Sequence, residues 1–291
     1  MAERGFPEKR AVRRAFERAA LAYDRHAVLQ REVGGRLAQH LDPIRLAPRT
    51  VVDLGCGTGE AFAELARRFP AAQVVGIDLA RGMLEAARAR TPAWRRWLRA
   101  RSPRLVCADA ERLPLATGSA QLAWSNLALQ WCRPEAVFAE VARVLEPGGL
   151  IMFSTFGPDT LKELRAAFAA VDDHQHVNPF VDMHDLGDAL VHAGLAEPVM
   201  EMEVLTLEYA SVEAVARDLQ AIGARNALPN RPRGLSGRGR WQRMVAAYER
   251  ERRGAVLPAT YEVIYGHAWK VAPRKLADGR QVIDFRPREA R

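Results

Sequence analysis

Acidic residues end three successive strand-like runs in the first half of this sequence, and two of these runs lead directly into helical patterns. "TVVDLGCGTG" (50–59) is a β-branched run that enters a glycine turn, and "EAFAELARRF" (60–69) after it has helical periodicity. "AQVVGIDL" (72–79) and "RLVCADA" (104–110) repeat the strand pattern. Strands that alternate with helices predict a parallel sheet covered on both faces, with ligands bound at the carboxyl ends of the strands.

The remaining elements extend this α/β pattern and suggest how the chain is divided. We expect further strands at 122–126, 148–156, 198–209 and 259–270, and helices over 8–41, 134–146, 159–171 and 182–195. A largely helical segment between the last two strands has the form of a lid. The expected organisation is a helical cap at 1–45, a main domain at 46–270 with the lid inserted at about 211–255, and a polar tail at 271–291.

Composition limits the compartment more than the activity. The chain has 291 residues, 48% of them hydrophobic, which is enough to bury a large core. Cys56, Cys107 and Cys132 are widely spaced and form no CxxC pair, as suits a reducing cytoplasm. No apolar run is long enough to cross a membrane, and the first ten residues are charged. We therefore expect a cytoplasmic protein with no membrane partner.

The positive charge of the chain is concentrated in arginine. The formal net charge is +8, and an attraction to anions does not by itself distinguish nucleic acid, membrane or acidic protein. Between Leu219 and Tyr248 there are six arginines and no acid: Arg225, Arg231, Arg233, Arg238, Arg240 and Arg243. This stretch suits an anionic substrate or an acidic partner protein, or it is simply a solvated arginine-rich face. A second acid-free run, Arg88–Arg104, contains Trp94 and Trp97 but no recognisable RNA-binding module, so we expect no nucleic-acid partner.

The glycine turn and the three strand-end acids predict the parts of one ligand. The spacing in "DLGCGTG" is GxGxG, tighter than that of pyrophosphate-binding turns, and Asp53 places a carboxylate that would repel phosphate and attract an ammonium. Asp78 is placed to hydrogen-bond the two hydroxyls of a ribose. Asp109 can accept a hydrogen bond from an adenine amino group. The expected ligand has an amine, a ribose and an adenine; a dinucleotide fold with a degenerate loop is the alternative.

From about residue 50 to 155 the chain resembles the class I S-adenosylmethionine-dependent methyltransferases. The resemblance implies a Rossmann-like, seven-stranded, mostly parallel sheet and S-adenosyl-L-methionine as cofactor. It also implies that Asp53, Gly55, Gly57 and Gly59 hold the methionine part, Asp78 the ribose, and Asp109 with Ala110 the adenine, while Met83 packs on the cofactor.

"QLAWSNLALQWC" (121–132) is a buried strand pattern broken by two polar residues, Ser125 and Asn126. In a doubly wound sheet the end of this strand lies beside the crossover point, so Asn126 and Leu127 should border the reactive methyl group. The alternative is that Asn126 caps a helix and Trp131 fills the core. Together with "FERAALAYDRHAVLQ" (16–30), "IGARNALPNRPRGLSGR" (222–238) and "LPATYEVIYG" (257–266), the stretch is similar to the malonyl-acyl carrier protein O-methyltransferases of biotin synthesis, the BioC family.

This resemblance implies methylation of the free carboxylate of malonyl carried on an acidic acyl carrier protein. A carboxylate is ionised at neutral pH, with a reference pKa near ~4, so no strong base is needed. We expect catalytic roles for three residues: Arg225 as a carboxylate binder, Tyr23 over the cofactor, and Asn126 beside the methyl group. Oligomeric state and the choice between carrier protein and coenzyme A are not fixed by the sequence.

Three other functions remain open at this point. "FGPDTLKELR" and "LPATYEVIYGHAWK" also resemble complex I assembly factors that keep the fold and are assigned an arginine hydroxylation. A methyltransferase for a small free acid such as trans-aconitate would need the lid but no docking face. A non-catalytic RNA-binding protein could keep the fold as a relic. The histidines of "DDHQHVNPFVDMHD" (172–185) lack a metal-ligand spacing, so we expect a solvated loop with helix-starting acids and no metal.

Overall fold

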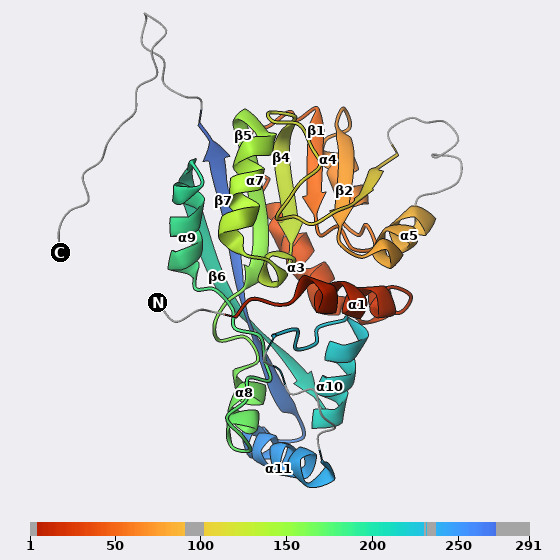
Figure 1. Cartoon of the computed structure of the whole chain (residues 1–291), viewed down its shortest axis with the longest axis vertical. Coiled ribbons are helices and arrows are strands. Elements are labelled where there is room, and N and C mark those ends of the chain that lie inside the picture. The colour runs from red at the N-terminus through yellow and green to blue at the C-terminus, as the bar shows by residue number, and fades with distance from the viewer. Residues whose placement is uncertain (1–4, 91–101, 230, 232–236, 272–291) are drawn as a thin grey trace, which may run out of the picture.

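The structure, a computed structural model, describes residues 5–90, 102–229, 231 and 237–271. Within these ranges seven strands form one sheet in the order β3-β2-β1-β4-β5-β7-β6 (Figure 1). The strands β1 to β5 pair in parallel, and β7 runs antiparallel to both β5 and β6. This confirms the expected α/β, mostly parallel sheet. The strands are β1 Thr50–Leu54, β2 Gln73–Asp78, β3 Arg104–Cys107, β4 Ala120–Asn126, β5 Leu145–Phe156, β6 Leu195–Tyr209 and β7 Leu257–Lys270.

Helices occupy both faces of the sheet and its lower end. The helices are α1 Lys9–Ala19, α2 Tyr23–His26, α3 Val28–Gln39, α4 Phe62–Arg68, α5 Arg81–Arg90, α7 Pro134–Val144, α8 Lys162–Ala169, α9 Met183–His192, α10 Val212–Ala221 and α11 Arg238–Tyr248. Two short 3₁₀ turns, η1 Leu129–Trp131 and η2 Glu249–Glu251, complete the described elements. None of the described helices is both long and apolar enough to cross a membrane.

Successive residues of each central strand enter opposite layers of the core, because side chains alternate along a strand. Val51 and Leu122 pack with α3 and α4 on one face of the sheet. Val52 and Ala123 pack with α7 and α9 on the other. The successive residues Val51 and Val52 are both buried, and so are Leu122 and Ala123. Burial on both faces explains why these strands appear as continuous apolar runs in the sequence.

The long antiparallel strands β6 and β7 extend together below the rest of the sheet (Figure 1). Helices from three parts of the chain gather around the end of this strand pair. Val215 of α10, Met244 and Tyr248 of α11, and Ala167 of α8 form a separate small core there with Leu257. Helices α10 and α11 lie between β6 and β7 in the chain, where the lid was expected. Helix α1 lies across the region between this unit and α5 (Figure 1).

Several boundaries differ from the sequence expectation: the helical segment expected at 8–41 is divided into α1, α2 and α3, and β6 begins at Leu195 instead of 198. The helix expected at 134–146 ends at Val144, and β5 begins at Leu145 instead of Gly148. The reason is that Leu145 pairs with Ala120 across an irregularity in the β4–β5 register, before regular pairing starts at Leu150. Trp94 and Trp97, and nearly all of the expected tail, lie outside the described residues.

Truncation of a core residue should show how much the α7 layer contributes to stability. Phe138 is fully buried on α7 and contacts Phe153 at a ring-centroid distance of 5.4 Å. We expect Phe138→Ala to lower the free energy of unfolding by about 3–5 kcal/mol, because both the transfer energy and the packing are lost. Glu135→Ala, at an exposed position of the same helix, should cost less than about 1 kcal/mol. Urea denaturation of both variants measures the free energy of unfolding. Equal losses in the two variants would contradict the assignment of Phe138 to the core.

Candidate functional site

The carboxyl ends of β1, β2, β3 and β4 meet at one edge of the sheet, where the glycine turn follows β1. Gly55 and Gly57 have positive φ angles of 71° and 53°. A Cβ on Gly55 would lie 2.3 Å from the Cβ of Ala128, so a side chain would both strain the backbone and clash. The turn therefore requires glycine at this position, and it brings the backbone of β1 next to the loop after β4.

Asp78, at the end of β2, is tied to the glycine turn. Its Oδ2 accepts a hydrogen bond from the Gly57 amide at 2.9 Å, and its Oδ1 accepts one from the Ala80 amide at 2.8 Å. Burial raises the pKa of Asp78 to about 6, although the two backbone amides favour the ionised form. The carboxylate is thus held in a fixed orientation at the point where the two strands end.

Asp53 is a buried acid with an unused acceptor. The residue is 2% exposed, and its Oδ2 has no hydrogen-bond partner among the residues that the structure describes. Burial, with a smaller contribution from the charge of Asp78, raises the pKa of Asp53 to about 8. A buried polar atom without a partner is costly, so this oxygen is an acceptor that a ligand, an ion or a water molecule can satisfy.

A cavity of about 670 Å³, called here the glycine-loop cavity, opens beside these residues. The cavity is lined by Lys9, Val12, Phe16, Tyr23, Gly55, Gly57, Ile77, Asp78, Leu79, Met83, Ala108, Asp109, Ala110, Asn126, Leu127, Ala128, Trp131 and Cys132. The predicted site residues Gly55, Gly57, Asp78, Met83, Asp109 and Ala110 are therefore brought together.

Asp53 and Gly59 do not line the glycine-loop cavity. Asp53 lies behind the turn, as its burial shows. Gly59 has a φ of 79°, and a Cβ there would lie 2.6 Å from the ring of Phe62. Gly59 consequently allows α4 to pack closely against the turn, and its contribution to the cavity is indirect.

A second cavity of about 710 Å³, the lid cavity, lies next to the first. It is lined by Phe16, Tyr23, Gln30, Leu127, Gln130, Trp131, Phe156, Thr160, Leu161, Leu164, His176, Val177, Asn178, Phe180, Leu219, Ile222, Ala224, Arg225, Asn226 and Tyr261. No aspartate or glutamate is among these residues. Arg225 is exposed and forms no salt bridge with any residue that the structure describes, so it adds a positive charge without a paired acid to the cavity wall.

Four residues line both cavities and form their common wall: Phe16, Tyr23, Leu127 and Trp131. The rings of Phe16 and Trp131 meet edge to face, with centroids 5.4 Å apart. Leu127 has a φ of 48°, an unfavourable conformation for a leucine, held by hydrogen bonds from its amide to the backbone O and the Oγ of Ser154. Burial and the charges of Asp78 and Asp24 raise the pKa of Tyr23, so its hydroxyl stays protonated and can donate.

Asn126 lines the glycine-loop cavity, but its amide is engaged with the protein. Its Nδ2 donates to the backbone oxygen of Gln30 at 2.8 Å, and its Oδ1 accepts from the Ser154 hydroxyl at 2.7 Å. Ser125 donates to the backbone oxygen of Leu54 at 3.0 Å. The polar break at the carboxyl end of β4 thus joins α3, β1, β4 and β5 at the cavity edge.

Two expectations about charged segments need correction. His176 does not lie in a solvated loop: its ring stacks on Phe168 at 3.9 Å and its side chain is 12% exposed, because the loop folds back over α8. The arginine-rich stretch is partly neutralised by acids outside it, since Arg231 pairs with Glu8 and Arg240 with Asp172. Arg233 lies outside the described residues. The expectation of a helix-starting acid is met by Asp182, whose side chain caps α9.

Several lining residues had no predicted role. Phe16 and Trp131 were visible in the sequence only as apolar positions, and Gln130 and Asn178 carried no motif. Lys9 reaches Asp109 over a separation of 100 residues, so no local pattern could have indicated the contact.

Comparison with known proteins agrees with this geometry. Residues 52–153 match a family described as "Methyltransferase domain". Among solved structures, the YcgJ protein of Bacillus subtilis shares the fold with a TM-score of 0.58 at 15% identity, over 83% of this chain and 99% of that one. A Bacillus halodurans protein has a TM-score of 0.56 at 19% identity, over 82% and 99%. The fold is therefore that of the class I methyltransferases.

Relatives at much higher identity cover nearly the whole chain. The malonyl-[acyl-carrier protein] O-methyltransferase of Laribacter hongkongensis is 57% identical over 99% of both chains. The protein of the same name from Gallionella capsiferriformans is 53% identical over 95% of this chain and 96% of its own. With its glycine turn, strand-end acids and lid all inside these alignments, the chain belongs to the malonyl-[acyl-carrier protein] O-methyltransferase family.

Proposed function

We propose that this protein transfers a methyl group from S-adenosyl-L-methionine to the free carboxylate of a malonyl group held on an acyl carrier protein. The observation that carries the proposal is the pairing of two adjoining cavities. One is lined by the strand-end acids Asp78 and Asp109, and the other by Arg225, which has no salt-bridge partner among the described residues. Relatives with the malonyl name match over almost their full length, which favours this acceptor over arginine hydroxylation or a small free acid.

The acidic groups in and behind the wall of the glycine-loop cavity match the polar groups of the cofactor. Asp78 would accept from ribose hydroxyls and Asp109 from adenine, both as residues that line the cavity. Asp53 lies behind the turn, and its carboxylate would attract the ammonium through its negative charge. Gly55 and Gly57 let the backbone approach the ligand, and Met83 packs beside it. When bound, S-adenosyl-L-methionine supplies a methyl group on a positively charged sulfur.

The lid cavity would bind and orient the acceptor. Its carboxylate is already ionised at neutral pH, so no side chain has to remove a proton. Arg225 offers a planar pair of donors that matches the two carboxylate oxygens. Tyr23, on the common wall, can donate a hydrogen bond to the same group. Catalysis then rests on orientation and desolvation, an effect of roughly 7 kcal/mol or more in favourable cases.

An acidic carrier protein has a basic surface available near the lid. Arg238 and Arg243 of α11 are exposed and form no salt bridge with the described residues, in contrast to Arg240. We propose that these arginines contact the carrier protein, and that the ester product serves biotin synthesis.

Incubation of the protein with labelled cofactor and malonyl-carrier protein, malonyl-coenzyme A or trans-aconitate tests the identity of the acceptor. Label should enter a base-labile ester of the malonyl carrier protein; label in trans-aconitate alone would contradict the proposal.

Removal of the Asp78 carboxylate, the proposed partner of the ribose hydroxyls, should weaken cofactor binding. Asp78→Ala deletes a carboxylate that lines the cavity, and a hydrogen bond to a charged group contributes about 1.5–3 kcal/mol. We expect the Kd of S-adenosylhomocysteine to rise at least about tenfold in calorimetry. Asp188→Ala, at an exposed position of α9, should leave the Kd unchanged. Because Asp78 also accepts two backbone hydrogen bonds, thermal denaturation must show that the variant is folded at the assay temperature; unchanged binding would refute the assignment.

Removal of the Arg225 guanidinium should affect binding of the malonyl acceptor and leave binding of the cofactor unchanged. We expect Arg225→Ala to raise the KM for the malonyl acceptor at least about tenfold while the Kd of S-adenosylhomocysteine stays within about twofold. Arg217→Ala removes the same charge from an exposed position of α10 and should change neither quantity. A variant that loses cofactor affinity and keeps its acceptor KM would contradict the role given to Arg225.

The raised pKa of Asp53 predicts proton release on cofactor binding. With a pKa of about 8 the free protein carries a proton on Asp53 at pH 7, and this proton must leave before the carboxylate can pair with an ammonium. Cofactor affinity should therefore rise with pH between 6 and 7.5, by up to about tenfold per unit. Calorimetry at pH 7 in buffers of different ionisation enthalpy should detect the released proton. Asp53→Asn keeps the shape and should abolish the release; an unchanged release would assign the proton to another group.

A further inference from the structure

Lys9, the first residue of α1, ends among Asp109, Glu111 and Cys132, and the first and last of these also line the glycine-loop cavity. Its Nζ lies 2.9 Å from Asp109 Oδ1, 2.9 Å from Glu111 Oε1 and 3.2 Å from Cys132 Sγ. Lys9 itself lines the cavity beside Asp109. Neither the proposed cofactor contacts nor the acceptor chemistry uses this lysine.

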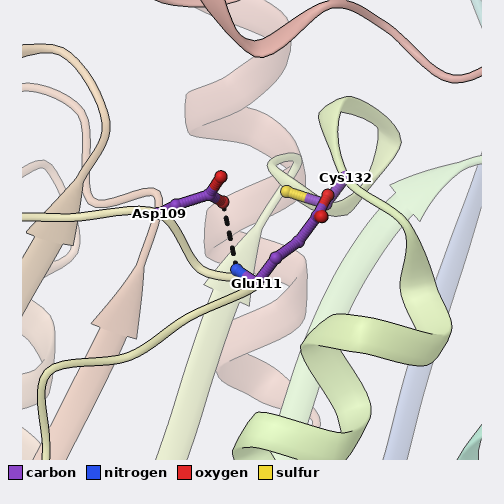
Figure 2. A group of neighbouring side chains, drawn as sticks. All are labelled: Asp109, Glu111 and Cys132. Atoms are coloured by element: carbon purple, nitrogen blue, oxygen red, sulfur yellow. Dashed lines mark hydrogen bonds between the residues drawn. The ribbon is translucent and has the colours of Figure 1, made fainter.

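Asp109, Glu111 and Cys132 by themselves resemble a metal-binding group. Figure 2 shows their side chains converging from two loops, and their ligand atoms lie within 4.8 Å of one another. The Lys9 ammonium, however, is within hydrogen-bond distance of all three residues and occupies the place of a cation. Burial also raises the pKa of the Cys132 thiol to about 11, so the sulfur is protonated at neutral pH and is a poor metal ligand.

The ammonium fixes the orientation of the Asp109 carboxylate. Oδ1 of Asp109 accepts from Lys9 Nζ and from the Glu111 amide at 3.0 Å, the hydrogen bond drawn in Figure 2. No residue that the structure describes donates a hydrogen bond to Oδ2. One oxygen is therefore anchored by two donors, while the other remains available on a residue that lines the cavity.

The helix that carries Lys9 is anchored at its other end as well. Glu17 of α1 accepts hydrogen bonds from the Arg81 and Gly82 amides, both at 2.8 Å, at the first turn of α5. Between the two anchors, α1 contributes Val12 and Phe16 to the cavity lining. The position of the Lys9 ammonium is thus set by a helix that is held at both ends.

We propose that Lys9 is a positioning residue for adenine recognition, which orients Asp109 so that Oδ2 accepts the adenine amino group. The inference rests on the proposed function, because it requires an adenine-containing cofactor in the glycine-loop cavity. Without the ammonium, the Asp109 carboxylate can rotate and lose its fixed acceptor. Selectivity for a base with an amino donor then falls, since discrimination depends on a preorganised partner.

The experiment compares binding of S-adenosylhomocysteine and S-inosylhomocysteine, which has a carbonyl in place of the amino group. In the unmodified protein the inosine compound should bind at least about tenfold more weakly, because its carbonyl faces a carboxylate oxygen. Lys9→Met should reduce this ratio several-fold, mainly by weakening the adenosine compound. Lys9→Gln, a second neutral variant, should act in the same direction, and Lys9→Arg should recover part of the ratio.

Arg10→Met is the matched control, because it removes one positive charge from an exposed position of the same helix. It should leave the ratio of the two dissociation constants unchanged. Equal weakening of both compounds by Lys9→Met and Lys9→Gln, or an unchanged ratio, would overturn the proposal and leave Lys9 a structural role only. Failure of the unmodified protein to bind S-adenosylhomocysteine would instead refute the proposed function on which the inference rests.

Discussion

The removal of two carboxyl groups from water at the end of the parallel sheet is the constraint on which the site depends. Asp53 and Asp78 are both buried, and burial raises the pKa of each. Such an arrangement is unfavourable in the free protein, because two acids are held together in a region of low dielectric constant. A cationic or hydroxyl-rich ligand would relieve this cost, so the same burial that disfavours the ionised acids favours binding. The glycine turn supports the arrangement, because the Gly57 amide donates a hydrogen bond to Asp78.

The positions of the sheet acids were predictable because they depend on local patterns. A strand, a glycine turn and a helix follow one another within about twenty residues, and parallel strands place their carboxyl ends at one edge. Asp78 and Asp109 therefore line one cavity, as the sequence indicated. Tyr23 and Arg225 also line cavities; that expectation combined the carboxylate acceptor implied by the family resemblance with the acid-free arginine stretch and the helical pattern around Tyr23.

Features that depend on tertiary packing could not be predicted in this way. His176 is polar and lies between acids in the sequence, yet Phe168 covers its ring. Two of the arginines in the acid-free stretch pair with Glu8 and Asp172, which are distant in sequence from their partners. The left-handed conformation of Leu127 has no signal in its side chain, since only the surrounding hydrogen bonds hold it. These cases share one cause: the partner is supplied by another element of the fold.

The two cavities are built from different parts of the chain. Every residue that lines the glycine-loop cavity comes from the first 132 positions, whereas the lid cavity takes all residues beyond its common wall, except Gln30 and Gln130, from Phe156 to Tyr261. Substitutions in the second half of the gene can therefore alter which acceptor is methylated without disturbing the residues that hold the methyl donor. Different parts of the sequence thus form the site of the methyl donor and the site of the acceptor. New acceptor specificities can arise by changes to the β6–β7 insertion and to the segment before β6.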